Sequence, residues 1–114
     1  MITISVDEAY AFDFLSILEV KRVYLPHTNS LYELYCKEIK AQTEETLFIT
    51  ILASEEYKEL VCINRKIYDN LELLRAGKDV AASIIDNLNS DRYRLKTSIQ
   101  LTYFNSNVSE TKSK

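Results

Sequence analysis

The stretch AFDFLSILEVK, residues 11–21, combines an apolar helical stripe with a line of polar residues, and it decides how the chain folds. The stripe runs at helical spacing and consists of Ala11, Phe14, Leu15 and Leu18. Asp13, Ser16 and Glu19 recur every three residues in the same stretch, so they stay near one another on the helix. A helix of this pattern buries part of its polar line together with its apolar stripe. We therefore expect side chains from other helices to meet these polar groups.

The composition of the 114-residue chain favours helices and a single domain. It contains one glycine and one proline, which leaves few positions for tight turns. Hydrophobic residues make up 46% and charged residues 27%, proportions that are ordinary for a globular protein. We expect one helical domain over residues 1–104, with a short extended arm at its N-terminus, and a polar tail over residues 105–114.

Charge and hydropathy patterns exclude several classes of protein. The formal net charge of −3 argues against a nucleic-acid-binding protein, because such proteins usually carry a basic excess. No segment reaches the roughly 18 consecutive apolar residues of a membrane span. Residues 1–10 lack the basic start and the apolar run of a signal peptide. Cys36 and Cys62 have no CxxC spacing, so we expect free thiols in the reducing cytoplasm.

Capping residues and a proline bound the first two helices. The first is expected over residues 6–23, where Ser5 and Glu8 have the spacing of a capping box. Pro26 then breaks the chain, because proline cannot continue a helix. A second capping box that begins at Ser30 predicts the start of the next helix.

Two more segments follow in the middle of the chain. A short helix restarts at Thr43, although the run FITIL at residues 48–52 is β-branched enough to allow a strand instead. A long helix opens at Ser54, followed by the acidic residues that a helix start favours. It is expected to end at Gly77, which suits a left-handed cap.

The last helix is expected to be capped by Asp79, with a kink or break near residues 87–91. On the long helix before it, apolar residues alternate steps of three and four as in a coiled-coil seam: Tyr57, Leu60, Asn64, Ile67, Leu71 and Leu74. These patterns predict an all-α small antiparallel helical bundle, or a long helical hairpin braced by the first helix. The seam also favours self-association as a homodimer.

Familiar catalytic and metal-binding patterns are missing from the sequence. His27 is the single histidine, and it has no zinc-ligand spacing with the two cysteines. The run EExxE at residues 55–59 is similar to the magnesium-binding helix of all-α nucleotide pyrophosphohydrolases. The second acidic pair of that family is absent, because Arg75 stands three residues after Glu72. We expect neither a metal nor a cofactor.

The polar line on the first helix needs partners. A buried carboxylate at Asp13 or Glu19 is costly unless a cation or a hydrogen-bond donor meets it. The candidate cations are Arg75, Arg92, Arg94 and Lys96. Asn64 interrupts an apolar seam, which is explained by register control or by membership of a polar network. Salt-bridged pairing of helices and a ligand pocket both remain open as interpretations.

Three motifs resemble those of an uncharacterised family of short helical bacterial proteins. LSILEVK, with Asp13 just ahead of it, resembles the family's opening D-x-I-T-I-L-E-I-K. Residues 64–75 are similar to N-x-x-L-W-x-x-x-[DE]-x-x-R, with Tyr in place of Trp. Residues 89–100 are similar to N-D-x-R-x-x-I-K-x-x-I-N, with Ser in place of the acid. Similar openings occur in small proteins of phages that infect marine cyanobacteria.

The resemblance implies a helical fold but no known reaction. The family's bacterial members accompany cell-surface polysaccharide and glycosyl-transfer functions, which implies a sugar phosphate, a nucleotide sugar or an enzyme partner. The matched polar positions largely coincide with those that the residues alone mark as difficult to bury. The expected site is a mixed-charge cluster between helices, formed by Asp13, Ser16, Glu19, Asn64, Glu72, Arg75, Asn89, Arg92 and Lys96.

Three hypotheses of function follow. The first is a non-enzymatic binding or accessory protein, whose arginines and lysine in the cluster contact an anionic small molecule or a protein partner. The second is a purely structural charge network, with the function in a homodimer or partner interface. The third is a small enzyme that uses Asp13 or Glu19 as a general acid or base on a phosphorylated sugar. An opening beside the arginines favours the first hypothesis, and a sealed, fully paired network favours the second.

Overall fold

The computed structural model describes residues 6–104, which form helices and connecting turns with no strand among them. In chain order the elements are α1 (Glu8–Tyr24), η1 (Pro26–Thr28), α2 (Asn29–Gln42), α3 (Glu45–Leu52), α4 (Glu55–Arg75), α5 (Ala82–Ile99) and η2 (Gln100–Phe104). The expected all-α small helical bundle is therefore confirmed. The predicted polar tail lies outside the described residues, as does nearly all of the predicted N-terminal arm.

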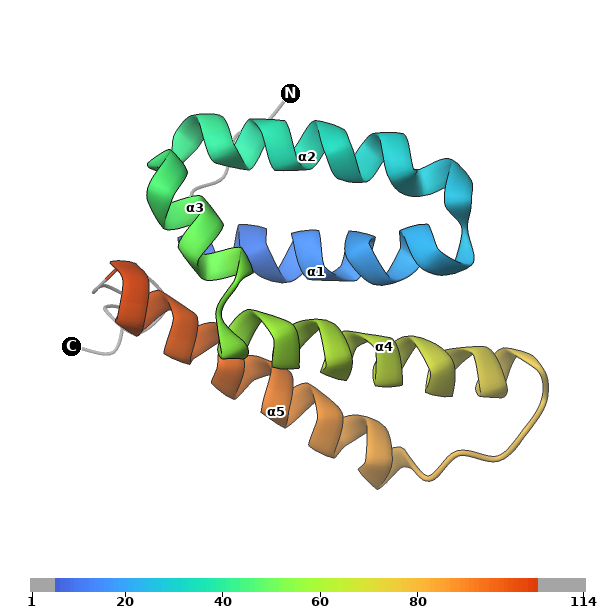
Figure 1. Ribbon diagram of the computed structural model, residues 1–114. Helices are drawn as coiled ribbons and strands as arrows, with labels where there is room; N and C mark the ends of the chain where they lie inside the picture. Colours follow the sequence, from blue (N-terminus) through green and yellow to red (C-terminus); the bar gives the residue numbers. More distant parts are fainter. Residues whose placement is uncertain (1–5, 105–114) are drawn as a thin grey trace.

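Two antiparallel helix pairs make up the bundle (Figure 1). α1 pairs with α2 and α4 pairs with α5, while the short α3 connects the two pairs. α1 lies between α2 and α4, and η2 continues α5 toward the first turn of α1. The first helix is thus the central one, in contact with α2, α4 and α5.

The central position of α1 explains its burial. Phe12 and Leu15 are fully buried, and the Phe12 ring lies 5.9 Å from that of Phe48 and 6.2 Å from that of Phe104. Both belong to a hydrophobic core that consists of Ala9, Phe12, Leu15, Ile39, Phe48, Ile51, Tyr57, Leu60, Leu95 and Ile99. The sides of α1 that face α4 and α5 carry polar residues of the line as well as apolar ones. Asp13 and Ser16 are consequently buried as well, at 2% and 0% exposure.

Several of the predicted helix boundaries are confirmed. Pro26 opens η1, which separates α1 from α2. The Ser54 Oγ accepts a hydrogen bond from the Tyr57 backbone N–H at 3.2 Å and so caps α4. Gly77 follows the end of α4 with φ +80°, the left-handed conformation in which a residue with a Cβ is strained.

Two predicted caps are wrong. The capping box at Ser30 does not form, because η1 leads directly into α2 and the residue at the cap position, Thr28, is already helical and makes no side-chain cap hydrogen bond. Asp79 does not cap the last helix. α5 begins only at Ala82, preceded by extended backbone at Ala81.

Segments 48–52 and 87–91 each contradict one expectation from the sequence: a strand in the first and a break in the second. FITIL is helical within α3, because this places Phe48 and Ile51 in the core at 5% and 0% exposure. Burial of large apolar side chains thus outweighs the β-propensity of the run. The predicted break at 87–91 is wrong, since α5 continues through it without interruption.

Candidate functional site

The buried carboxylate of Asp13 is the centre of a polar network between three helices. The Arg92 guanidinium of α5 donates from Nε to both carboxylate oxygens at 3.0 and 3.1 Å, and from Nη2 to Oδ2 at 2.6 Å. The Asp13 side chain is 3% exposed and that of Arg92 is 28% exposed. These hydrogen bonds raise the pKa of the Arg92 guanidinium above its ordinary value. Asp13 and Arg92 are therefore a nearly enclosed ion pair between α1 and α5.

Asn64 of α4 completes this network from the other side. Its Nδ2 donates to Asp13 Oδ1 at 3.1 Å and to Ser16 Oγ at 2.7 Å. The Ser16 hydroxyl in turn donates to the Asp13 backbone carbonyl at 2.6 Å. Asn64 is 4% exposed, and no buried side-chain N or O atom in the described part of the chain lacks a hydrogen-bond partner. The buried polar atoms of the network are therefore all hydrogen-bonded.

Lys96 adds a second cation at the edge of the network. Its Nζ lies 3.8 Å from Asp13 Oδ2 and 4.9 Å from the centre of the Tyr10 ring, in cation–π geometry. The Lys96 side chain is 24% exposed. One carboxylate thus faces two cations, and the surplus positive charge lies at the surface beside Tyr10.

Glu19 has a different partner from the rest of the polar line. Its Oε2 accepts a hydrogen bond from the Tyr57 hydroxyl at 2.7 Å, which ties α1 to the start of α4. Burial of the phenol, together with the negative charge of Glu19, raises the pKa of Tyr57 above its ordinary value. The partner of Glu19 is therefore the neutral hydroxyl group of Tyr57 and not a cation.

Besides Glu19, three predicted site residues lie apart from the network. Glu72 and Arg75 form an exposed ion pair with each other, three residues apart on the last turns of α4. Asn89 is exposed on α5, and its side chain donates to no member of the network in the described structure. The members that come together are Asp13, Ser16, Asn64, Arg92 and Lys96.

Gln100 is a buried polar residue that was not among the predicted site residues. Its Oε1 accepts from the Ala9 backbone N–H at 2.8 Å, and its Nε2 donates to Glu8 Oε1 at 2.9 Å. The residue at the cap position of α1, Asp7, makes no side-chain cap hydrogen bond. The C-terminal end of the fold therefore caps the first turn of α1 across 91 residues. In the sequence, the signal for this role is that Gln100 supplies the amide at the end of the third motif, residues 89–100.

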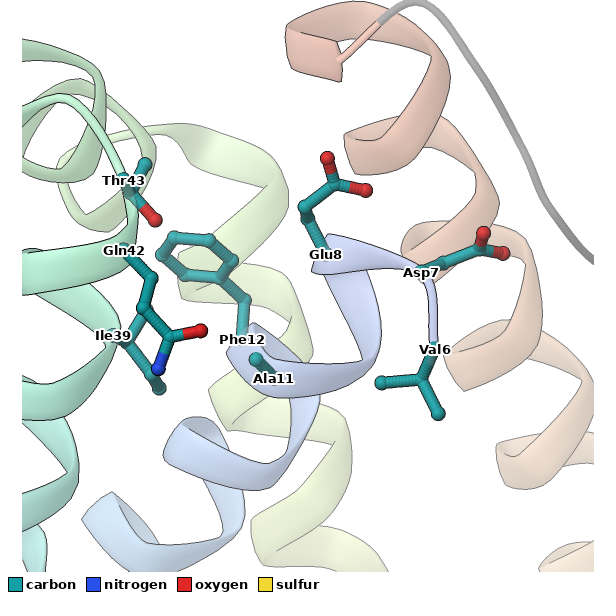
Figure 2. A pocket seen from close by; sticks show the side chains of 8 residues that line it. All are labelled: Val6, Asp7, Glu8, Ala11, Phe12, Ile39, Gln42 and Thr43. Atoms are coloured by element: carbon teal, nitrogen blue, oxygen red, sulfur yellow. The ribbon is translucent and has the colours of Figure 1, made fainter. Parts of the chain in front are cut away.

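Two adjoining hollows lie between the first half of α1 and the end of α2. The smaller, of about 190 Å³, is lined by Val6, Asp7, Glu8, Ala11, Phe12, Ile39, Gln42 and Thr43. Figure 2 shows the Phe12 ring directed toward Gln42 and Thr43, with Glu8 on the opposite side. The larger, of about 450 Å³, is here called the α1–α2 groove and is lined by Val6, Tyr10, Ala11, Phe14, Leu34, Tyr35, Glu38, Ile39 and Gln42. Neither hollow is lined by Arg92 or Lys96.

Within residues 6–104 no three His, Cys, Asp or Glu side chains are placed to hold a metal ion. No helix of this part of the chain is long and apolar enough to cross a membrane. The Asp13 carboxylate, the strongest candidate for a general acid or base, is enclosed and fully occupied by Arg92, Asn64 and Lys96.

Comparison with known proteins found no matching family model, no matching curated protein and no matching solved structure. The resemblance to the short helical bacterial and phage proteins therefore stays a prediction.

Proposed function

We propose that this chain is a non-enzymatic binding protein of the cytoplasm, in which the mixed-charge cluster is a structural clamp and a protein partner binds at uncovered apolar helix surface. This is the second of the three hypotheses. The observation that carries it is the closure of the network around Asp13, whose side chain is 3% exposed and bonded to both Arg92 and Asn64. A site for a ligand needs donors that are free to contact it, whereas these donors already bind Asp13.

The α1–α2 groove is the surface proposed for the partner. Its walls carry the aromatic side chains Tyr10, Phe14 and Tyr35, and its rim carries Glu38. The rings of Phe14 and Tyr35 pack edge to face with their centres 5.0 Å apart, which gives the groove an aromatic wall. Large apolar side chains in a hollow are the usual anchors of protein interfaces. A partner with apolar side chains and a basic flank fits this surface.

The test is a pair of matched substitutions of exposed apolar residues. Leu34 lines the groove and is 52% exposed, while Ile49 lies outside it on α3 and is 56% exposed. The wild type, Leu34→Glu and Ile49→Glu would be used to capture partners by cross-linking in the source cells. The proposal expects a protein that the wild type and Ile49→Glu both capture and Leu34→Glu loses, with direct binding then measured from purified components. If no captured protein distinguishes the two variants, the groove is not the binding surface.

An anionic ligand is the second candidate, and the surplus charge of the cluster favours it. Arg92 and Lys96 oppose a single carboxylate, and their side chains remain 28% and 24% exposed. A sugar phosphate or nucleotide sugar would then bind at the surface beside Tyr10. Phosphate, sugar phosphates, nucleotides and nucleotide sugars would be screened by thermal shift, where a ligand at 100 times its Kd stabilises by about 2.7 kcal/mol. A shift that Lys96→Met removes would favour this candidate over the clamp, and no shift would exclude it.

A further inference from the structure

Val6 is the residue at which the chain meets the α1–α2 groove. Its side chain lines this groove and the smaller hollow beside it, and Ala11 lines both hollows as well. Val6 stands just before the cap position of α1, and Ala11 is the fourth residue of the helix. These are the two positions of a hydrophobic staple, which fixes the angle at which a chain enters a helix. The segment that precedes Val6 therefore starts at the groove.

The sequence that leads to Val6 has the pattern of an extended chain with one apolar face. In MITISV, residues 1–6, the β-branched apolar residues Ile2, Ile4 and Val6 occupy every second position. The backbone of Asp7, which follows, is extended, with φ −60° and ψ 146°. Every second side chain of an extended segment lies on the same face, about 6.6 Å from the next. Because Val6 lines the groove, an extended segment turns Ile4 and Ile2 toward it as well.

The groove has the spacing and the chemistry to receive these two side chains. On its α1 wall Tyr10 and Phe14 are four residues apart, a separation of about 6 Å along a helix. This is close to the spacing of Ile4 and Ile2 in an extended chain. Of the nine residues that line the groove, Glu38 alone is charged. An apolar segment thus fits the groove without placing a charge against an unlike surface.

We propose that residues 1–5, here called the arm, are the resident occupant of the α1–α2 groove. The arm lies extended along the groove, with Ile4 and Ile2 packed on the wall formed by Tyr10 and Phe14. Its attachment at Val6 gives it an effective concentration on the order of millimolar, which favours it over free apolar segments. The inference rests on the proposed function for what the arm regulates, because a protein that binds in the groove must first displace the arm.

Tryptophan fluorescence tests the placement of the arm, since the chain has no tryptophan of its own. Leu34→Trp puts a reporter in the groove, and Ile49→Trp puts one outside it at a position of similar exposure, 52% against 56%. Ile4→Asp carries a charge into the groove and should release the arm, whereas Thr3→Asp adds the same charge on the outward face. Acrylamide quenching of the groove reporter should therefore rise with Ile4→Asp to the level of the outside reporter and stay unchanged with Thr3→Asp.

Two results would overturn this placement. One is a groove reporter whose quenching neither Ile4→Asp nor Ile2→Asp changes, because the arm would then lie elsewhere. The other is an equal rise with Thr3→Asp, because the added charge and not the direction of the side chain would then act. The outside reporter should respond to none of these substitutions, and circular dichroism checks that each variant keeps its helicity.

The regulatory role has its own readout, which separates it from the proposed function. If no protein is captured at the groove, the proposed function fails, while the quenching data still place the arm. If quenching does not change, the arm fails, while capture by the wild type and its loss in Leu34→Glu still stand. With a purified partner, Ile4→Asp should bind more tightly than Thr3→Asp, because occupancy by the arm lowers the apparent affinity. Equal affinities would show that the arm does not control access to the groove.

Discussion

Asp13 and Arg92 are 79 positions apart in the chain, yet they form an ion pair in which the carboxylate side chain is only 3% exposed. The guanidinium donates three hydrogen bonds to the carboxylate, so the pair fixes both the distance and the rotation of α5 relative to α1. Asn64 binds the same carboxylate from α4. A single acidic side chain on the central helix thus holds two other helices in register.

Arg92→Ala is expected to destabilise the fold by about 3–5 kcal/mol, because it leaves the buried Asp13 carboxylate without its main partner. The free energy of unfolding from urea denaturation gives the measure. Arg75→Ala is the matched control, since it removes an exposed arginine from an ion pair on a helix surface and should cost at most about 1 kcal/mol. Equal costs for the two variants would contradict the structural role of the Asp13–Arg92 pair. Arg92→Lys provides a folded comparison if the alanine variant does not fold.

The contacts of Asn64 with Asp13 and Ser16 predict energetic coupling across the α1–α4 interface. A double-mutant cycle with Asp13→Ala and Asn64→Ala should give an interaction energy of about 0.5–3 kcal/mol, because the two residues share one network. The same cycle between Asp13 and Asn70 should give nearly zero, since Asn70 is bonded to a backbone carbonyl on its own helix. Additive costs for Asp13 and Asn64 would mean that their hydrogen bond contributes nothing to stability.

The local part of the fold was predictable from the sequence where a residue acts on its own backbone. Pro26, Ser54 and Gly77 mark a break, a start and an end of helices through conformations and hydrogen bonds within a few residues. Predictions that depended on distant partners were confirmed only in part, and for FITIL the sequence left a short helix and a strand as alternatives. FITIL is helical because the core needs Phe48 and Ile51, and sequence spacing does not report which neighbour covers a segment.

The candidate site was predictable in part, for a similar reason. The need of buried carboxylates for partners, the Asn64 interruption of an apolar seam and the motif resemblance brought Asp13, Asn64 and Arg92 into one set, and the structure joins them. Spacing alone shows only which residues share a helix face. Spacing does not show where a neighbouring helix ends. Glu72 and Arg75 share the face of α4 that meets α1, but α1 stops before them and they pair with each other.

Gln100→Ala is expected to cost about 2 kcal/mol, because it removes a buried cap from the first turn of α1 and leaves the Ala9 N–H without its acceptor. Thermal and urea denaturation both report this loss. Asn89→Ala on the exposed side of α5 is the control and should change the stability by no more than about 0.5 kcal/mol. A larger effect at Asn89 than at Gln100 would contradict the assignment of Gln100 as the cap.

Alkaline pH should weaken the fold through Tyr57. Burial and the nearby Glu19 raise the pKa of Tyr57 above the ordinary value of 10.0, so the folded state holds the phenol proton more tightly than the unfolded state does. The contribution of Tyr57 is therefore fully present below pH 10 and is lost as the pH rises further, at up to about 1.4 kcal/mol per pH unit. Tyr32, whose pKa is also raised by burial, adds to the loss in the same direction.

Tyr57→Phe separates this contribution from the rest of the fold. At pH 7 the variant should lose about 1.5 kcal/mol, because the hydrogen bond to the Glu19 carboxylate is gone. Above pH 10 the difference between the wild type and Tyr57→Phe should shrink, since the unfolded wild type gains by ionising a phenol that the variant lacks. Urea denaturation at pH 7, 9, 10 and 10.5 measures it, with the exposed Tyr93→Phe as a control that should match the wild type at pH 7 within about 0.5 kcal/mol. A difference between the wild type and Tyr57→Phe that stays constant through pH 10.5 would show that the Tyr57–Glu19 contact does not hold the phenol proton in the folded state.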